Sequence, residues 1–193
     1  MILARDFYLR ANVLKVAKDL LGKYLFTRID GKTTAGIIVE TEAYAGVTDK
    51  ASHAYGDRRT PRTEIMYAHG GVAYVYLCYG IHHLFNVVTN QAGIPHAVLI
   101  RAVVPAEGIE TILQRRKKTK LSDSVASGPG MVSEALAIKK SHSGADLMGK
   151  TIWLEDRNIQ IATRSIICSP RIGVDYAEED AQLPYRFRVN LRC

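Results

Sequence analysis

The chain has 193 residues, of which 47% are hydrophobic, so one domain can bury its core without disulfide or metal cross-links. Its 26 Lys and Arg residues outnumber 19 Asp and Glu residues, and the net charge of +7 favours a polyanion such as nucleic acid, although ordinary surface charge gives the same balance. The three cysteines (Cys78, Cys168 and Cys193) and the lack of a long apolar run exclude a disulfide framework, a zinc knuckle and a membrane span, and they predict a cytoplasmic protein.

Hydrophobic periodicity predicts a mixed α/β (α+β) fold with a largely antiparallel sheet. In chain order the pattern predicts a helix over 11–21, strands over 34–44, 72–77, 84–89 and 96–104, helices over 107–116 and 131–138, and strands over 152–154, 159–162 and 185–189. The polar stretch 117–127 is expected to be a surface loop. No repeat suggests a second domain, so we expect one compact domain over 1–193.

The first predicted strand carries two carboxylates. Its two-residue period places Glu40, Glu42 and Tyr44 on one face of the sheet. Arg101 interrupts the apolar run of a later strand, and a buried arginine needs an anionic partner. Glu42 is therefore a solvent-facing carboxylate, a salt-bridge partner of Arg101 or a reactive group.

Aromatic and basic side chains crowd into one stretch of the sequence. They are Tyr44, Tyr55, Tyr67, Tyr74, Tyr76 and Tyr79, together with His53, Arg58, Arg59 and Arg62. Aromatic rings interleaved with cations suit stacked bases, whereas single tyrosines on strands are as often core residues. The runs 72–77 and 84–89 flank Gly80 and predict a hairpin with Tyr79 at its turn.

These motifs together resemble the alkyladenine (3-methyladenine) DNA glycosylase family over nearly the whole chain. The matching segments are Val39-Glu40-Thr41-Glu42-Ala43-Tyr44, His53, Thr60-Pro61-Arg62, 74–80, Asn86, Leu99-Ile100-Arg101-Ala102, Ser127-Gly128-Pro129, 135–138 and Arg171-Ile172-Gly173-Val174. The resemblance implies a curved sheet flanked by helices, a protruding β-hairpin, and a monomer that acts on double-stranded DNA containing damaged purines. It also implies a nucleoid association if the source is bacterial.

The resemblance assigns the chemistry to two residues. Glu42 would be the general base that activates a water for attack on the deoxyribose C1′, and its anion would stabilise the cation-like sugar. Arg101 would hold the water and keep Glu42 ionised. Glu40 is expected to be structural, and no metal or cofactor is implied. The enzyme would be monofunctional, because a carboxylate rather than an amine occupies the position.

The resemblance also assigns the base pocket. Tyr44, His53 and Tyr76 would form its walls, where a positively charged alkylated base gains cation–π attraction. The imidazole of His53 could donate a hydrogen bond to the base. Asn86 would crowd the exocyclic amine of guanine, and the backbone at Ile172 would contact water and base.

Several residues are expected to contact the duplex. Tyr79 would wedge into the space that the flipped nucleotide leaves, unless it folds back onto the core. Arg58, Arg59 and Arg62 would grip phosphates from a loop that leads into a short helix capped by Thr60 and started by Pro61; a solvated charged loop is the alternative. Met131 departs from the family, which commonly has a basic residue there.

The expected substrates are 3-methyladenine first, then 7-methylguanine, hypoxanthine and ethenoadenine. Two other functions fit parts of the sequence. One is a non-catalytic binder of damaged or single-stranded nucleic acid, in which Glu42 has no task. The other is a metal-dependent hydrolase using His82, His83 and Glu40 or Glu42, against which the spacing of these residues argues.

Overall fold

Eight strands form one antiparallel sheet in the computed structural model, which describes residues 1–191. The strands are β1 (Tyr24–Ile29), β2 (Lys32–Tyr44), β3 (Ala73–Cys78), β4 (His82–Thr89), β5 (His96–Glu107), β6 (Ile152–Glu155), β7 (Ile167–Ser169) and β8 (Arg186–Arg188). The α-helices are α1 (Arg5–Tyr8), α2 (Val13–Asp19), α3 (Ile109–Arg115) and α4 (Pro129–Ala135). Seven 3-10 helices complete the described part: η1 (Gly46–Thr48), η2 (Tyr55–Asp57), η3 (Glu64–Tyr67), η4 (Asp123–Ala126), η5 (Lys140–His142), η6 (Thr163–Ser165) and η7 (Asp175–Gln182).

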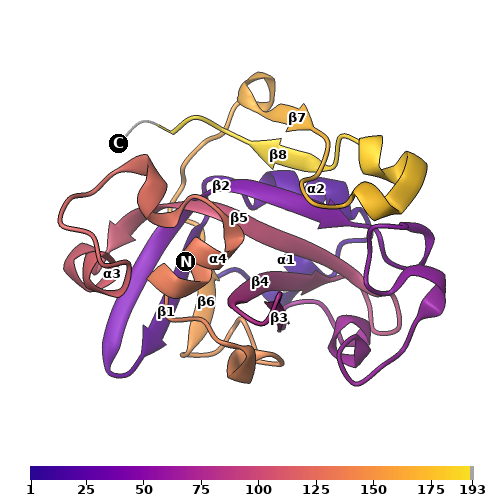
Figure 1. Cartoon of the computed structure of the whole chain (residues 1–193), viewed down its shortest axis with the longest axis horizontal. Helices are drawn as coiled ribbons and strands as arrows, with labels where there is room; N and C mark the ends of the chain where they lie inside the picture. The colour runs from indigo at the N-terminus through magenta and orange to yellow at the C-terminus, as the bar shows by residue number, and fades with distance from the viewer. Residues whose placement is uncertain (192–193) are drawn as a thin grey trace.

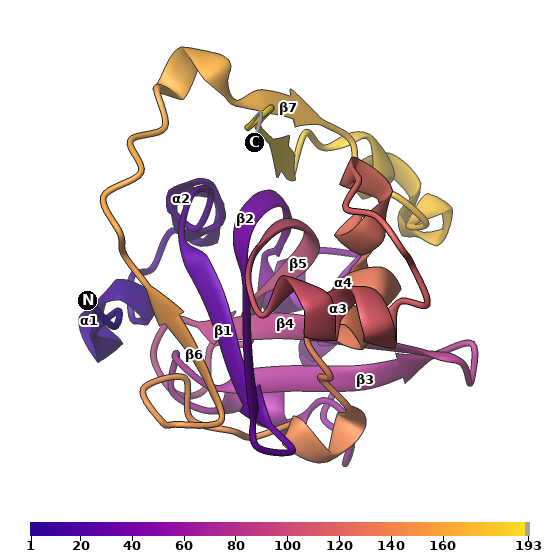
Figure 2. The same cartoon turned by 90° about the vertical axis from the view of Figure 1, so that its left-hand side faces the viewer.

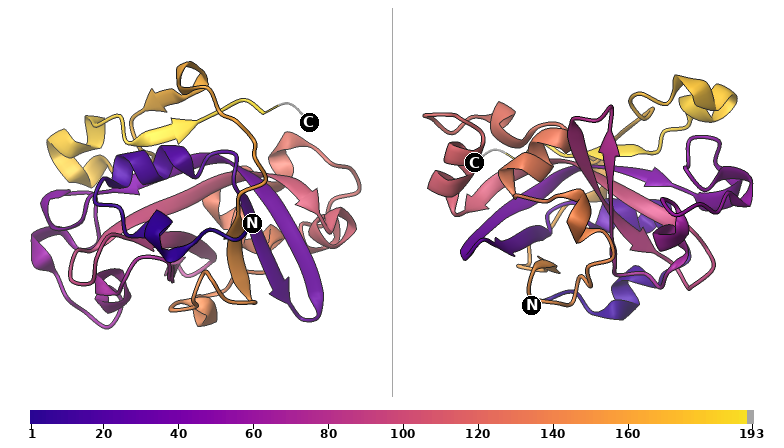
Figure 3. Two further views of the ribbon diagram at one scale, coloured as in Figure 1. Left: turned by 180° about the vertical axis from the view of Figure 1, so that it is seen from behind. Right: turned by 60° about the horizontal axis from the view of Figure 1, so that its bottom comes forward.

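The strands run in the order β3-β4-β5-β2-β1-β6, and β8 joins β2 beyond the end of β1, with β7 outside it (Figure 1). The sheet is curved. Helices α1 and α2 lie on one side of it and α3 and α4 on the other, while the tip of the β3-β4 hairpin projects beyond the body (Figure 2). Seen from behind, α2 lies across β2 (Figure 3, left). The predicted fold class is therefore confirmed.

Two tight turns set the strand pairing. Asp30 and Gly31 join β1 to β2 with φ angles of 54° and 71°, the type I′ geometry that suits an antiparallel hairpin. The β3-β4 turn consists of residues 79–81, with Tyr79 and Gly80 at φ angles of 49° and 72°. The turn that carries Tyr79 is thus where the sequence placed it.

Strand register builds a row of side chains across four strands. Glu42 of β2 pairs with Leu99 of β5, Leu99 pairs with Asn86 of β4, and Asn86 pairs with Tyr74 of β3. Directly opposed residues of an antiparallel pair present their side chains on the same face. The register therefore brings residues that lie up to 57 positions apart to one face of the sheet.

A β-bulge positions Arg101. Glu40 pairs with Ala102 and Thr41 pairs with Ile100, so Arg101 between them has no partner in β2. A bulge re-aims the side chain of the extra residue. The carbonyl of Arg101 instead accepts a hydrogen bond from the Gly128 amide at 2.8 Å, which ties the bulge to the start of α4.

Most predicted elements are present, with differences at their boundaries. The strand at 96–104 continues through Pro105 to Glu107, because a register shift at Ala35/Gly36 lets a proline sit opposite Gly36. The predicted helices are shorter or displaced: α2 starts after its N-cap Asn12, α3 starts after Gly108, and α4 starts at Pro129.

The strand predicted at 159–162 is wrong. Its isoleucines alternate as in a strand, but they pack over Gly22, where a Cβ would lie 3.0 Å from Ile161, and no strand pairs with them. The short strand β7 was missed, since most of its residues are exposed. The helix expected to start at Pro61 is a turn, and η3 begins only at Glu64. Cys193 lies outside the described residues.

Gly36 tests the packing of β2 against β5. A Cβ at this position would lie 2.5 Å from Cγ2 of Val103, so Gly36→Ala should lower the free energy of unfolding in urea by about 1–3 kcal/mol. Gly31→Asn is the control, because it has open space and asparagine tolerates the left-handed turn. Equal unfolding free energies for the two variants would contradict the close β2-β5 contact.

Candidate active site

A cavity of about 380 Å³ opens on the face of the sheet that carries the β2-β5-β4-β3 row, beside the start of α4. All five residues predicted for the base pocket line it. Tyr79, the predicted wedge, also lines it, together with several side chains that were not predicted. The predicted residues among them are Tyr44, His53, Tyr76, Tyr79, Asn86, Arg101 and Ile172. Glu42 has no exposed surface and lies behind this wall.

The Glu42 carboxylate accepts from donors on three chain segments. Oε1 accepts from the Ile172 amide at 2.8 Å and lies 3.3 Å from Nη1 of Arg101. Oε2 accepts from the Tyr44 hydroxyl at 2.9 Å. All three donor residues line the cavity, so a single layer of residues separates the carboxylate from the cavity.

Burial dominates the protonation of this carboxylate. Loss of water around Glu42 raises its pKa, while Arg101, the Ile172 amide and the Tyr44 hydroxyl lower it and nearby Glu40 raises it. We expected Arg101 to keep Glu42 ionised. It acts in that direction, but burial outweighs it, so Glu42 is a stronger base than an exposed glutamate.

Three aromatic rings form one wall of the cavity. His53 meets Tyr76 edge-on at 4.7 Å between ring centroids, and Tyr74 lies 5.4 Å from Tyr76. Nδ1 of His53 lies 2.8 Å from the Tyr74 hydroxyl. Tyr74 was part of the predicted aromatic cluster but was not assigned to the pocket; its register opposite Asn86 explains its place there.

Arg62 lies against the imidazole of His53. Nη2 of Arg62 lies 2.9 Å from Nε2 and 3.3 Å from Nδ1 of His53, and a guanidinium only donates, so this contact favours the neutral imidazole. Burial, Arg62 and Arg58 lower the pKa of His53 to about 4. His53 is therefore neutral at physiological pH. Its two nitrogens already contact the Tyr74 hydroxyl and Arg62, so neither is free for the hydrogen bond that we expected with the base.

The other two arginines of this loop differ in their surroundings. Arg59 stacks over Tyr67 at 3.8 Å and lies 3.6 Å from Glu64 and 3.9 Å from Asp57. Arg58 is exposed, and its carbonyl accepts from the Thr63 hydroxyl at 2.8 Å. Of the three, Arg62 points toward the aromatic wall, with its guanidinium 4.8 Å from the Tyr76 ring centre.

A buried ion pair holds the loop that carries Ile172. Arg171 donates to both carboxylate oxygens of Asp49, at 2.6 and 2.8 Å, and to the Ala43 carbonyl at 2.9 Å. The side chains of this pair are 0% and 2% exposed. Asp49 was not predicted, because nothing in its sequence neighbourhood distinguishes it from a surface aspartate. The pair fixes the Ile172 amide against Glu42.

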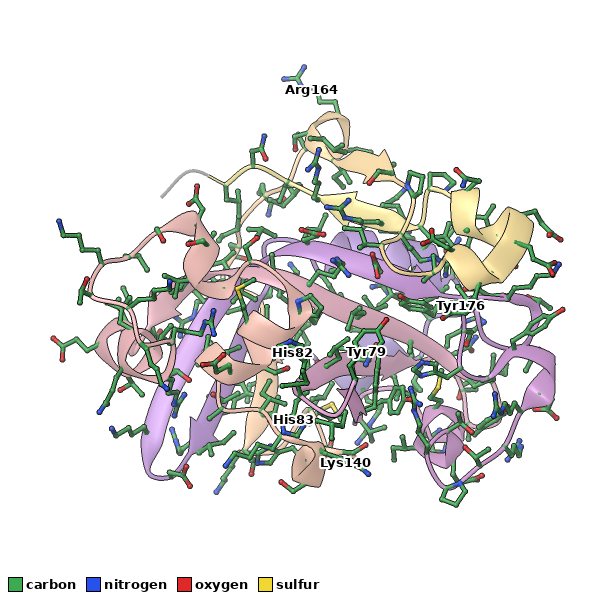
Figure 4. The ribbon with its side chains drawn as sticks, viewed as in Figure 1. Tyr79, His82, His83, Lys140, Arg164 and Tyr176 are labelled. Carbon is green, nitrogen blue, oxygen red and sulfur yellow. The ribbon has the colours of Figure 1, made fainter. Side chains whose placement is uncertain are left out.

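The rim of the cavity carries Tyr176, which the sequence did not single out, together with Met131 and Tyr79, which it did. Tyr176 is 64% exposed, yet its hydroxyl donates to the Ala51 carbonyl at 3.0 Å and holds the ring at the opening. Met131, which stands at the usually basic position, lines the cavity beside Gly128. Tyr79 is 90% exposed, and Figure 4 shows it with Tyr176 on one face of the molecule.

The residues proposed for a metal site have other contacts. The His82 ring packs against Gly130, and Nδ1 of His83 accepts from the Lys140 amide at 3.2 Å (Figure 4). Among residues 1–191, no three His, Cys, Asp or Glu side chains gather as metal ligands. Over the same residues, no helix is both long and apolar enough to span a bilayer.

An aromatic cavity with a basic, buried carboxylate behind its wall is the arrangement of an enzyme site for a flat ring. A family model described as methylpurine-DNA glycosylase (MPG) matches residues 6–192. Three bacterial relatives carry the name "Putative 3-methyladenine DNA glycosylase". The Chlamydia felis protein is 47% identical over 192 residues, covering 99% of this chain and 97% of its own length. The Desulfitobacterium hafniense protein is 45% identical over 192 residues (96% and 93%), and that of Bacillus cereus strain G9842 is 46% identical over 191 residues (94% and 92%).

The chain therefore belongs to the methylpurine-DNA glycosylase family. It is a DNA glycosylase, as the resemblance in the sequence implied, and not a non-catalytic binder.

The Arg171–Asp49 pair provides a test of how the site is held. Asp49→Asn leaves a buried arginine without a counter-charge and should lower the free energy of unfolding by about 3–5 kcal/mol. Asp146→Asn is the matched control, because Asp146 also accepts two hydrogen bonds from one arginine, Arg5, but at the surface, where such pairs contribute about 0–1 kcal/mol. Urea denaturation measures both. Similar losses of unfolding free energy in the two variants would show that the buried Arg171–Asp49 pair matters no more to stability than a surface ion pair.

Proposed function

We propose that this glycosylase flips damaged purines out of double-stranded DNA and hydrolyses their N-glycosidic bond with Glu42 as general base. 3-Methyladenine is the first substrate, and 7-methylguanine, hypoxanthine and ethenoadenine are further ones. The enzyme acts as a monomer without a metal or cofactor and leaves an abasic site.

The observation that carries this proposal is the environment of Glu42. The carboxylate is fully buried, burial raises its pKa, and its three donors line the cavity. A carboxylate placed only for stability does not need to lie against a cavity. A base that must take a proton from water benefits from a raised pKa.

In the reaction, the oxygen of a water molecule bonds to C1′ while the bond from C1′ to the purine nitrogen breaks. The electron pair of that bond leaves with the base, and Glu42 takes a proton from the water. The anion also stabilises the cation-like sugar. Arg101 and the Ile172 amide lie on the cavity side of the carboxylate, where they can orient the water.

The aromatic wall supports recognition of electron-poor purines. Tyr44 and Tyr76 line the cavity. Each ring already lies beside a cation, Arg171 at 4.9 Å from the Tyr44 centroid and Arg62 at 4.8 Å from the Tyr76 centroid, the kind of contact that a positively charged base would make. His53 is neutral and so does not repel that charge. The amide nitrogen of Asn86 donates to the Tyr74 and Leu84 carbonyls, which holds its side chain rigidly where it would crowd the amine of guanine.

The exposed tyrosine of the hairpin supports insertion into the duplex. Tyr79 is 90% exposed in a left-handed conformation that is unusual for a bulky residue, so it does not fold back onto the core. Arg58 and Arg59, with Arg62 beside the aromatic wall, lie on the loop expected to contact phosphates.

Glu42→Gln tests the catalytic role. The assay measures single-turnover release of hypoxanthine from a duplex, and of methylated bases from alkylated DNA, with EDTA present throughout. We expect the wild type to release these bases and the variant to release none, while DNA binding is retained. The melting temperature at neutral pH should stay the same or rise, because an acid with a raised folded-state pKa destabilises the fold once pH exceeds its ordinary value.

The control for this variant is Glu107→Gln, the same change in a glutamate paired with Arg157 at the surface. It should excise like wild type. Equal excision by wild type and by the Glu42→Gln variant would move the general base elsewhere, and no release from either DNA by folded wild type would contradict the proposed substrates.

Tyr79→Ala tests the wedge. Losing the ring should slow excision from duplex about tenfold or more, because nothing then occupies the space left by the flipped nucleotide. Excision from single-stranded DNA should change little. Tyr55→Ala, which removes another exposed tyrosine, is the control. A uniform loss on both substrates would contradict an insertion role.

A further inference from the structure

A second carboxylate, Glu40, lies behind the arginine that contacts Glu42. Its Oε1 accepts from Nε of Arg101 at 2.9 Å and from Nε of Arg186 at 2.6 Å. The side chains of Glu40, Arg101 and Arg186 are only 15%, 11% and 17% exposed. The four charged groups, including Glu42, form a row that alternates in sign: Arg186, Glu40, Arg101, Glu42.

We propose that Glu40, directed by Arg186, is a positioning residue that holds Arg101 in place while Glu42 gains and loses its proton. This inference rests on the proposed role of Glu42 as general base.

The reason is the change of charge during catalysis. When Glu42 takes a proton from water, it becomes neutral and no longer balances Arg101. A nearly buried arginine without an anion is unstable and would move or draw in water. Because Glu40 takes no part in this proton transfer, Arg101 retains one carboxylate partner in both states.

The geometry allows both contacts at once. Arg101 uses Nε for Glu40 and Nη1 for Glu42, so the two carboxylates meet different edges of one guanidinium. The β-bulge at Arg101 aims the side chain toward both. Strand β8 pairs with β2 only at residues 40–42, which places Arg186 directly opposite Glu42 and within reach of Glu40.

The charge of Glu40 also acts on the basicity of Glu42. Other groups facing Glu42 are the hydroxyl of Tyr44 on β2, Arg101 on β5, the Ile172 amide, and, farther off, Arg171 and Tyr176. Unlike Arg101, the Ile172 amide and the Tyr44 hydroxyl, which lower the pKa of Glu42, Glu40 raises it. Glu40 also shares Arg101 with Glu42. Removing the Glu40 charge should therefore lower the pKa of Glu42 and leave it a weaker base.

The experiment measures single-turnover excision against pH from a duplex with one 7-methylguanine, using the full chain and rates normalised to active enzyme. This base already carries a positive charge and leaves without a further proton, so the loss of rate at low pH reports Glu42. Glu40→Gln should reduce the plateau rate on the order of 10- to 100-fold and move the acid midpoint to lower pH, with DNA binding unchanged.

Arg186→Gln should move the acid midpoint in the opposite direction, to higher pH. It removes a positive charge and leaves Glu40 to pair with Arg101 alone, which loosens the hold of Arg101 on Glu42. If Glu40→Gln does not fold, the direction of the midpoint shift in Arg186→Gln alone tests whether the Glu40–Arg101 contact controls the basicity of Glu42. Glu107→Gln, a surface carboxylate on the same strand as Arg101, should change neither rate nor midpoint.

An unchanged midpoint in both variants would overturn the inference, whether or not the rate falls, since a merely structural role does not change the basicity of Glu42. No excision by wild type would instead contradict the proposed function. In that case, a ¹³C NMR titration of the Glu42 carboxyl in the free protein tests the inference, which requires a lower midpoint in Glu40→Gln.

Discussion

The architecture depends on keeping a carboxylate with no exposed surface within its longest strand. A buried anion is tolerated only if donors replace the water it has lost. For Glu42 the donors are the Arg101 guanidinium, the Ile172 amide and the Tyr44 hydroxyl. A different structural feature positions each donor. A β-bulge directs Arg101, an ion pair holds the loop of Ile172, and the two-residue period of the strand places Tyr44 on the same face as Glu42.

These features connect the site to distant parts of the chain. The loop at Ile172 is held by Arg171 and Asp49, a second buried ion pair. Arg101 is held through Glu40 by Arg186 from β8, close to the end of the described chain. Buried or nearly buried ion pairs therefore surround the Glu42 carboxylate, so the stability of the fold and the geometry of the site depend on the same contacts. Ion pairs of this kind contribute little net stability compared with apolar packing, and their presence points to function.

The sequence predicts most of this arrangement but not its connections. The strand with Glu42, the hairpin turn at Tyr79 and the interrupted run at Arg101 follow from local periodicity and turn residues, which act over a few positions. The register that aligns Glu42 with Leu99, and the pairing of Arg171 with Asp49, join residues far apart and leave no local pattern. The isoleucines at 159–162 mislead for the same reason: alternation predicts a strand only where an edge is available to pair with it.

Selectivity in such a pocket must come largely from the chemical step. The cation–π contact proposed for Tyr44 or Tyr76 would contribute about 0.5–1 kcal/mol at an exposed site and about 2 kcal/mol or more in a desolvated one, and 2 kcal/mol corresponds to roughly a 30-fold preference for a charged base over a neutral one. A charged base leaves as a neutral molecule, whereas a neutral purine needs a proton as it departs. His53 does not provide that proton, because its pKa is about 4 and Arg62 and Tyr74 occupy its two nitrogens. If the proposed function holds, the pocket would therefore bind both kinds of purine with modest discrimination, and the missing proton would slow only the neutral one.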